Sequence, residues 1–211
     1  MKRGRRREQA GSPRAPAVAA RAAETRAALV SAARRLFIEK GYFATGTEEI
    51  VVAAGVGTRG ALYHHFEDKR ALFLAVFEQV EQDLIAAAGD IPPVGGAFDV
   101  LRGGLLGFLD ASLTPEVQRV LLIDGPAVLG WQEWRELEER YGLGVIRSLL
   151  ELAVSDGTLP PQPIDALAHV LLAAVDEAAL FIANADDKQA AKEQAVGTVD
   201  RLLRGLATPA E

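Results

Sequence analysis

Residues 47–69, TEEIVVAAGVGTRGALYHHFEDK, contain two short segments with helical character separated by glycines. The first is expected to be a helix over 47–54 that ends at Gly55, and the second a helix over 58–66. A longer helix is expected before them, over 23–40, because its apolar residues recur at helical spacing. Two short helices joined by a tight turn after a longer first helix indicate a helix-turn-helix, whose second helix enters the major groove of DNA.

Polar residues in and around this second helix have side chains that can bind the bases and phosphates of DNA. The guanidinium of Arg59 has the fork that recognises guanine O6 and N7, and Gly60 would let the helix approach the duplex closely. The hydroxyl of Tyr63 and the ammonium of Lys69 are expected to reach phosphates. The predicted DNA-binding residues are Thr45, Thr47, Thr58, Arg59, Gly60, Tyr63, His64 and Lys69.

Residues 26–77 resemble the DNA-binding domain of the TetR family of bacterial repressors. The resemblance is carried by LFIEKGY at 36–42, AGV at 54–56 and GALYHHFEDK at 60–69. It implies an all-helical homodimer with one DNA-binding head per subunit. It also implies a larger C-terminal domain that holds the dimer interface and usually a small-molecule pocket whose occupancy weakens operator binding.

Two features depart from the family pattern. Five residues, 57–61, separate the Gly-Val and Leu-Tyr pairs where the family usually has four, which bears on where Thr58 and Arg59 point. Gly46 stands where the family commonly has a Ser or Thr N-cap, so the phosphate contact there is expected to shift to a neighbouring threonine. The segment 122–143 resembles a subgroup of these regulators, but this resemblance does not identify a ligand.

Composition and charge agree with a soluble bacterial regulator. Of 211 residues, 49% are hydrophobic and none is Cys, which excludes disulfide frameworks, cysteine–metal centres and thiol enzymes. Residues 1–70 carry 14 Lys and Arg against seven Asp and Glu, whereas residues 71–211 carry nine against 22. A basic first third suits a polyanion, although five of its basic residues belong to the N-terminal tail. We expect a cytoplasmic, nucleoid-associated protein without a membrane span, metal or cofactor.

The chain divides into three expected parts. Residues 1–20 are predicted to be a disordered basic arm, 21–68 the DNA-binding domain, and 69–211 a helical ligand-binding and dimerisation domain. About nine helices and no strand are expected, including one long helix over 126–154. The homodimer is expected to form through the last two helices, within about 165–206. These helices have more apolar residues than one core-facing stripe would contain, and their alanines allow close approach of a second copy.

The C-terminal domain contains a candidate pocket for a mostly apolar effector. Its predicted residues are Leu101, Leu105, Phe108, Asp124, Val128 and Trp131. Asp124 is either a helix cap or a polar anchor in this pocket, and the cap is favoured. Asp176 interrupts the most apolar helix, so it must face solvent, pair across an interface or point into a cavity.

The pattern as a whole predicts a ligand-responsive, sequence-specific repressor that binds a pseudo-palindromic operator as a homodimer. One alternative is a small-molecule-binding protein whose DNA head is disabled by the longer turn. A second is an enzyme, but no nucleophile–base pair or carboxylate dyad stands at readable spacing. A third is a non-specific nucleic-acid binder that uses only the arginine-rich arm.

Overall fold

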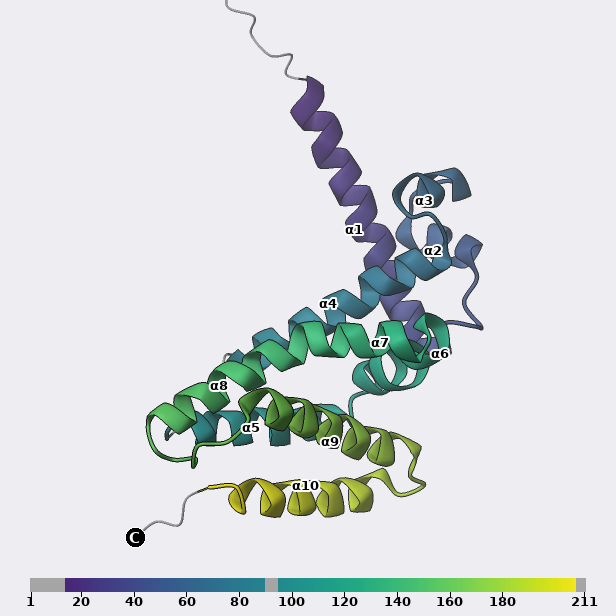
Figure 1. Cartoon of the computed structure of the whole chain (residues 1–211). Helices are drawn as coiled ribbons and strands as arrows, with labels where there is room; N and C mark the ends of the chain where they lie inside the picture. The colour runs from purple at the N-terminus through teal and green to yellow at the C-terminus, as the bar shows by residue number, and fades with distance from the viewer. Residues whose placement is uncertain (1–13, 90–94, 208–211) are drawn as a thin grey trace, which may run out of the picture.

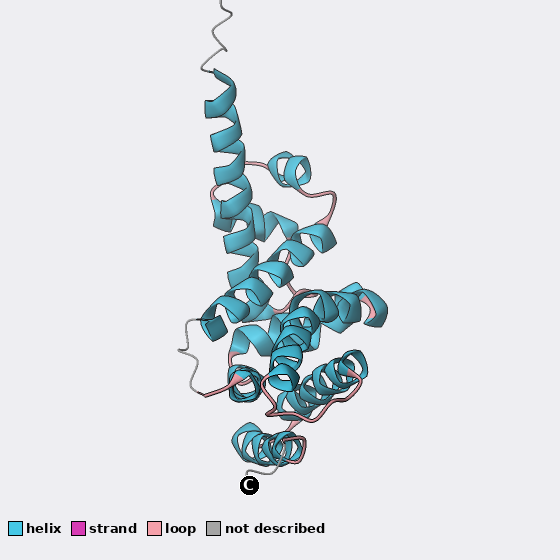
Figure 2. Cartoon of the chain, turned by 60° about the vertical axis from the view of Figure 1, so that its left-hand side comes forward, coloured by secondary structure: helices cyan, strands magenta, loops and turns pink. Residues whose placement is uncertain are grey.

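The computed structural model describes residues 14–89 and 95–207, and within these ranges the protein consists of helices and loops without a strand (Figures 1 and 2). Ten α-helices and two π-helical segments follow one another along the chain. They are α1 (Arg14–Lys40), α2 (Thr47–Ala54), α3 (Arg59–His65), α4 (Lys69–Gly89), α5 (Ala97–Ala111), η1 (Val117–Asp124), α6 (Gly125–Leu129), α7 (Trp131–Glu138), η2 (Glu139–Leu143), α8 (Gly144–Ser155), α9 (Ile164–Asn184) and α10 (Lys188–Arg204). The all-helical prediction is confirmed.

The first helix is longer than expected. It begins at Arg14, so residues 14–20 are helical and the prediction of a disordered arm is wrong for them, while residues 1–13 lie outside the described residues. The alanine-rich sequence that follows Arg14 favours a helix, and Pro16 is tolerated because it stands in the first turn. Figures 1 and 2 show the beginning of α1 projecting past the rest of the molecule.

The head is formed by α1, α2, α3 and the beginning of α4. The expected stripe of α1 is buried, and Phe37 at its end is fully enclosed, with its ring 5.5 Å from that of Phe73 on α4. Ile50 of α2 and Leu62 of α3 are also fully buried. These apolar contacts fix the two short helices against α1, so the opposite side of α3 is left exposed.

The C-terminal body is formed by α5 and the segments from η1 onward, with α9 and α10 at the end of the molecule far from α3 (Figure 1). The predicted long helix over 126–154 is wrong, because the chain breaks at Gly130 and winds as a π-helix over η2. Gly130 has a φ of +83°, which a right-handed helix does not accommodate. Trp134 follows this break, is fully buried and donates from Nε1 to the carbonyl of Leu121 at 3.0 Å.

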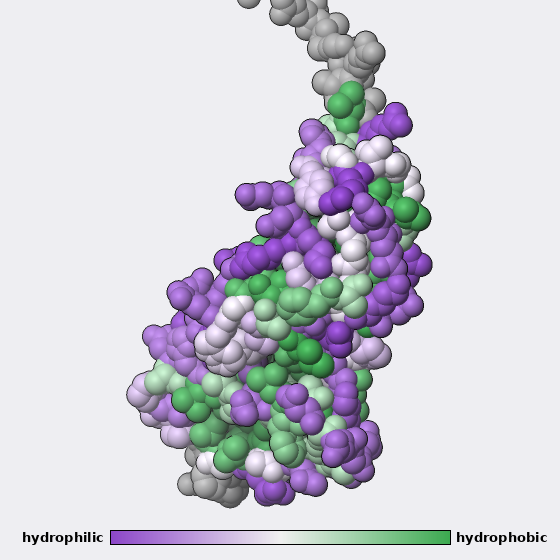
Figure 3. All heavy atoms as spheres, turned by 90° about the vertical axis from the view of Figure 1, so that its right-hand side faces the viewer, coloured by the Kyte–Doolittle hydropathy of each residue, from purple (hydrophilic) through white to green (hydrophobic). Residues whose placement is uncertain are grey.

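Helix α9 is apolar and long enough to cross a membrane by length and composition, and it is buried on one side and exposed on the other. It contacts α5, α8, α10 and both π-helical segments, and its Asp176 forms a buried ion pair with Arg135. The side of the molecule in Figure 3 shows hydrophobic surface over the lower, C-terminal part, interspersed with hydrophilic residues.

Candidate DNA-binding site and effector region

The turn between α2 and α3 is shaped by two glycines. Gly55 has a φ of +67° and donates its N–H to the carbonyls of Val51 and Val52, which ends α2. Gly57 has a φ of +78°. Both values lie in the left-handed region that glycine adopts without a steric cost. The chain then straightens at the exposed Thr58, and Arg59 becomes the first residue of α3.

The exposed side of α3 brings Arg59 and Tyr63 together one helical turn apart. A guanidinium nitrogen of Arg59 donates to the hydroxyl of Tyr63 at 3.3 Å, and another donates to Glu48 of α2 at 3.1 Å. The bond from Arg59, and then one with Thr47, lowers the pKa of the Tyr63 phenol. The side chain of Arg59 is 54% exposed, so its guanidinium can leave Glu48 for another hydrogen-bond acceptor.

Two more predicted residues of α3 lie on the same open surface. His64 is exposed, and its ring lies 5.2 Å from that of His65. A Cβ at Gly60 would have only the hydroxyl of Thr58 within 4 Å, at 3.6 Å, so no protein packing requires a glycine there. Among the described residues, no group of three His, Cys, Asp or Glu side chains is arranged to hold a metal ion.

Thr45 and Lys69 are committed to contacts inside the head, which corrects the expectation that their side chains face phosphates. Thr45 is buried, and its hydroxyl donates to the carbonyl of Gly41 at 2.8 Å. The ammonium of Lys69 donates to the carbonyls of Tyr42 and Thr45 at 2.8 and 2.9 Å and lies 4.0 Å from the centre of the Tyr42 ring. Burial lowers the pKa of this ammonium. Lys69 therefore holds together the loop that leads into α2.

Asp124 is neither the helix cap nor the pocket anchor that the sequence suggested. It is buried at the end of η1, forms no cap bond to α6, and accepts a hydrogen bond from the backbone N–H of Tyr42 at 2.7 Å. Its other partner is Arg119, at 3.3 Å, and Arg119 also donates to the carbonyl of Lys40 at 3.4 Å. Asp124 and Arg119 thus bind the end of α1 to the body.

A second joint connects α4 with the helices after η1. Arg70, directly after Lys69 in the first turn of α4, donates to the carbonyls of Val128 and Leu129 at 3.4 and 3.2 Å and pairs with Glu133 of α7. The predicted pocket residue Val128 is therefore half-buried beside the head–body joint. These contacts join α6 and α7 to the first turn of α4.

Of the predicted pocket residues, Trp131 alone lines one of the two hollows described here. Leu101 and Leu105 of α5 are buried in the core, and Phe108 is half-buried. Trp131 is 63% exposed on α7, with its ring 4.9 Å from that of the buried Trp134. An open hollow of about 500 Å³ beside Trp131 is lined by Leu129, Gly130, Trp131, Gln132, Glu133 and Glu136.

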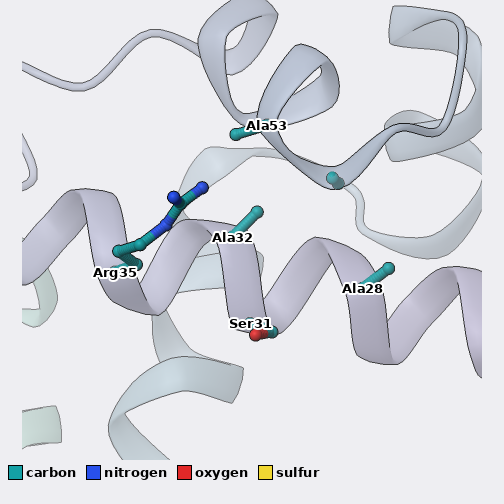
Figure 4. Close-up of a pocket in the computed structure, with 6 residues that line it drawn as sticks. Ala28, Ser31, Ala32, Arg35 and Ala53 are labelled. Carbon is teal, nitrogen blue, oxygen red and sulfur yellow. The ribbon is translucent and has the colours of Figure 1, made fainter.

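A second hollow lies on the head, between α1 and α2 (Figure 4). It measures about 280 Å³ and is lined by Ala28, Ser31, Ala32, Arg35, Ala53 and Ala54. In Figure 4 the side chain of Arg35 extends from α1 toward α2, beside small alanine side chains. None of the predicted DNA-binding or effector residues lines this hollow.

Comparison with known proteins agrees with this arrangement at both ends of the chain. Residues 29–76 match the family described as bacterial regulatory proteins, tetR family. Residues 98–206, about half of the chain, match the tetracyclin repressor-like C-terminal domain.

Individual relatives point the same way. A solved TetR-family transcriptional regulator from Pectobacterium atrosepticum is 33% identical, with a TM-score of 0.81 over 91% of this chain and 98% of that one. The Transposon Tn10 TetC protein of Escherichia coli is 27% identical over 68% of this chain and 72% of its own length. The regulator AcrR of Shigella flexneri is 38% identical, but the match covers 48% of this chain and 47% of AcrR. The chain therefore belongs to the TetR family of transcriptional regulators, which are DNA-binding proteins and not enzymes.

Proposed function

We propose that this ligand-responsive DNA-binding repressor acts as a homodimer on a pseudo-palindromic operator, with one α3 helix in each of two successive major grooves. The observation that supports the proposal most directly is the exposed Arg59–Tyr63 side of α3, on a helix whose opposite side is anchored by the fully buried Leu62. A packed helix with an exposed guanidinium at its N-terminal end meets the geometric requirement for reading base edges.

The residues of this surface take different parts in recognition. Arg59 and Thr58 face base edges, and Arg59 gives up its bond to Glu48 to donate to O6 and N7 of a guanine. Tyr63 and Thr47 contact phosphates. His64 lies on the same exposed surface, and Gly60 keeps α3 free of a side chain where the duplex comes closest. The structural roles of Lys69 and Thr45 make them supports of the interface rather than contacts.

Substitutions at two of these residues separate base reading from phosphate binding. Arg59→Ala is expected to relax the preference at one base pair per half-site, whereas Tyr63→Phe is expected to weaken binding to all sequences similarly. Fluorescence anisotropy with the selected site and with single-base variants of it measures both effects. An Arg59→Ala protein with an unchanged order of preference among these duplexes would remove Arg59 from base recognition.

The dimer is proposed to form through α9 and α10. Val170 and Phe181 of α9 and Leu202 of α10 are 63%, 51% and 61% exposed, and Ala166 and Ala173 on the same exposed side of α9 permit close approach of a second copy. Phe181→Glu is expected to shift the protein toward monomer in sedimentation velocity at micromolar concentration. A matched control is Val52→Glu on α2, because Val52 is 80% exposed on the head, away from this surface.

The effector is proposed to be a mostly apolar small molecule that acts by shifting the population of head positions. It would bind more tightly to a conformation in which the two α3 helices cannot span both half-sites. Phe108, Val128 and Trp131 remain candidates to contact it, whereas Leu101 and Leu105 would require the core to open. Arg70 and Asp124 connect the body to the head, so a change of conformation in the body could reach the head through their contacts. We propose a cytoplasmic, nucleoid-associated location to match this function.

A further inference from the structure

Three carboxyl groups are buried together between α4, α7 and α9. Glu81, Glu138 and Asp176 are 5%, 6% and 4% exposed. The guanidinium of Arg135 pairs with Asp176 and lies 3.6 Å from Glu139 at the edge of the cluster. One cation therefore faces three buried acids, and it is already engaged with one of them.

The two glutamates lack donors for their hydrogen-bond acceptors. Oε1 of Glu81 and Oε1 of Glu138 are buried and find no partner among the described residues. The two carboxyl groups are nevertheless close enough to hydrogen-bond to one another. Two ionised carboxylates cannot form such a bond, because each can only accept. A single proton on the pair supplies the missing donor and removes one buried charge.

We propose that Glu81 and Glu138 share a proton, and that its loss as the pH rises loosens the contact of α4 with α7 and weakens operator binding. Helix α4 carries the head at its other end, where Lys69 and Arg70 hold the α1–α2 loop and α6. Repulsion between two ionised glutamates would therefore act on the helix that directly follows α3 in the chain and packs against α1. The effect on DNA depends on the proposed function, whereas proton sharing does not.

Within the cluster, Glu81 and Glu138 are the two groups that are expected to hold a proton at the highest pH. Burial raises the pKa of Glu81 to about 7, and burial and Glu81 raise the pKa of Glu138 well above its usual range. Asp176 on α9 adds negative charge, and Arg135 on α7 offsets part of it. Other ionisable groups lie at the edge of the cluster: Glu78 on α4, Glu139 and Arg140 on η2, and His169 on α9. Arg140 lies 3.8 Å from Glu78, and His169 lies 3.8 Å from Glu139.

The first experiment follows urea unfolding of the full chain from pH 5 to 8.5. The folded pair keeps a proton that the unfolded glutamates release, so the unfolding equilibrium constant of the wild type is expected to rise by up to tenfold per pH unit between about pH 5 and 7. Glu81→Gln should reduce this rise and leave the share that Asp176 contributes. Glu78→Gln, one turn away on the same helix, should retain it, and His169→Gln measures the imidazole contribution. Parallel pH profiles of the wild type and Glu81→Gln would overturn proton sharing.

Infrared spectroscopy provides a second, independent measurement. The wild type is expected to show the carbonyl band of a buried, protonated carboxylic acid at pH 7, above the pKa of about 6 of Asp176, and this band should weaken as the pH rises further and be smaller in Glu138→Gln. This test requires only one foldable glutamate variant, so failure of Glu81→Gln to fold does not leave the proposal undecided. A wild type without the band at pH 7 would contradict the proposal.

The effect on DNA is measured by anisotropy with a selected operator duplex at constant ionic strength. From pH 6 to 8 the Kd of the wild type is expected to rise at least fivefold more than that of Glu81→Gln. Equal changes in the two proteins, together with the expected unfolding profiles, would refute the coupling to the head but not proton sharing. No specific DNA binding at any pH would refute the proposed function instead.

Discussion

Replacing Asp124 by alanine should weaken the attachment of the head to the body. The buried carboxylate accepts the Tyr42 N–H at 2.7 Å and meets Arg119 at 3.3 Å. A hydrogen bond to a charged group contributes about 1.5–3 kcal/mol, and removal of the carboxylate also leaves the buried Nε of Arg119 without its counter-ion. We therefore expect a loss of about 2–3 kcal/mol in the free energy of unfolding, or roughly 5–10 °C in Tm for a chain of this length.

Urea unfolding followed by circular dichroism measures this loss, and hydrogen exchange at the Tyr42 amide locates it. Asp124→Asn keeps an acceptor for Tyr42 and should lose about half as much. Asp110→Ala is the matched control, because Asp110 is 65% exposed and pairs with Lys192 at 3.0 Å, so its change should stay within about 0.5 kcal/mol. If Asp124→Ala were as stable as Asp110→Ala, with unchanged exchange at Tyr42, the proposed joint would be refuted.

Four further substitutions test other parts of the structure by the same unfolding assay. Lys69→Ala should cost about 2–3 kcal/mol because two carbonyls lose a charged donor, and a change below about 0.5 kcal/mol would contradict its structural role. Gly41→Ala should cost about 1–3 kcal/mol because Gly41 has a φ of +82°, whereas Gly103→Ala, in helix α5 with open space around it, should be neutral or stabilising. Burial raises the pKa of Asp176 from 3.8 to about 6, so this carboxyl group makes stability fall as the pH rises through that window. Asp176→Asn should flatten the fall, and an unchanged slope would exclude Asp176 as its source.

The sequence predicted the head well because its signals are local. Gly41 and Gly55 end α1 and α2 where expected, and the buried stripe of α1 follows from helical spacing alone. The exposed positions of Arg59 and Tyr63 follow from the same spacing, since Leu62 must face the core. Each of these features depends on residues a few positions apart.

Polar residues with distant partners could not be assigned in this way. Asp124 and Tyr42 are 82 positions apart, and Lys69 is 24 positions from Thr45. Nothing in the local pattern distinguishes a lysine that binds a phosphate from one that binds two carbonyls of its own chain. The position of Glu81 is similar, because its buried partners come from α7 and α9.

The body was predicted less well because periodicity identifies a buried face but not what lies against it. Leu101 and Leu105 have the spacing of a buried stripe, and α5 packs with them against neighbouring helices, among them α8, α9 and α10. The long helix expected across Gly130 failed for a different reason. Surrounding residues favour a helix, but the left-handed backbone at Gly130 divides it.

Selection of binding sites from random duplex DNA with the purified full chain tests the central claim most directly. The account predicts a two-fold symmetric motif, with half-sites spaced for two α3 helices on one face of the duplex. Recovery of no motif from a folded dimer would contradict it. That result would favour a small-molecule-binding protein whose five-residue turn, Gly57–Ala61, disables the head.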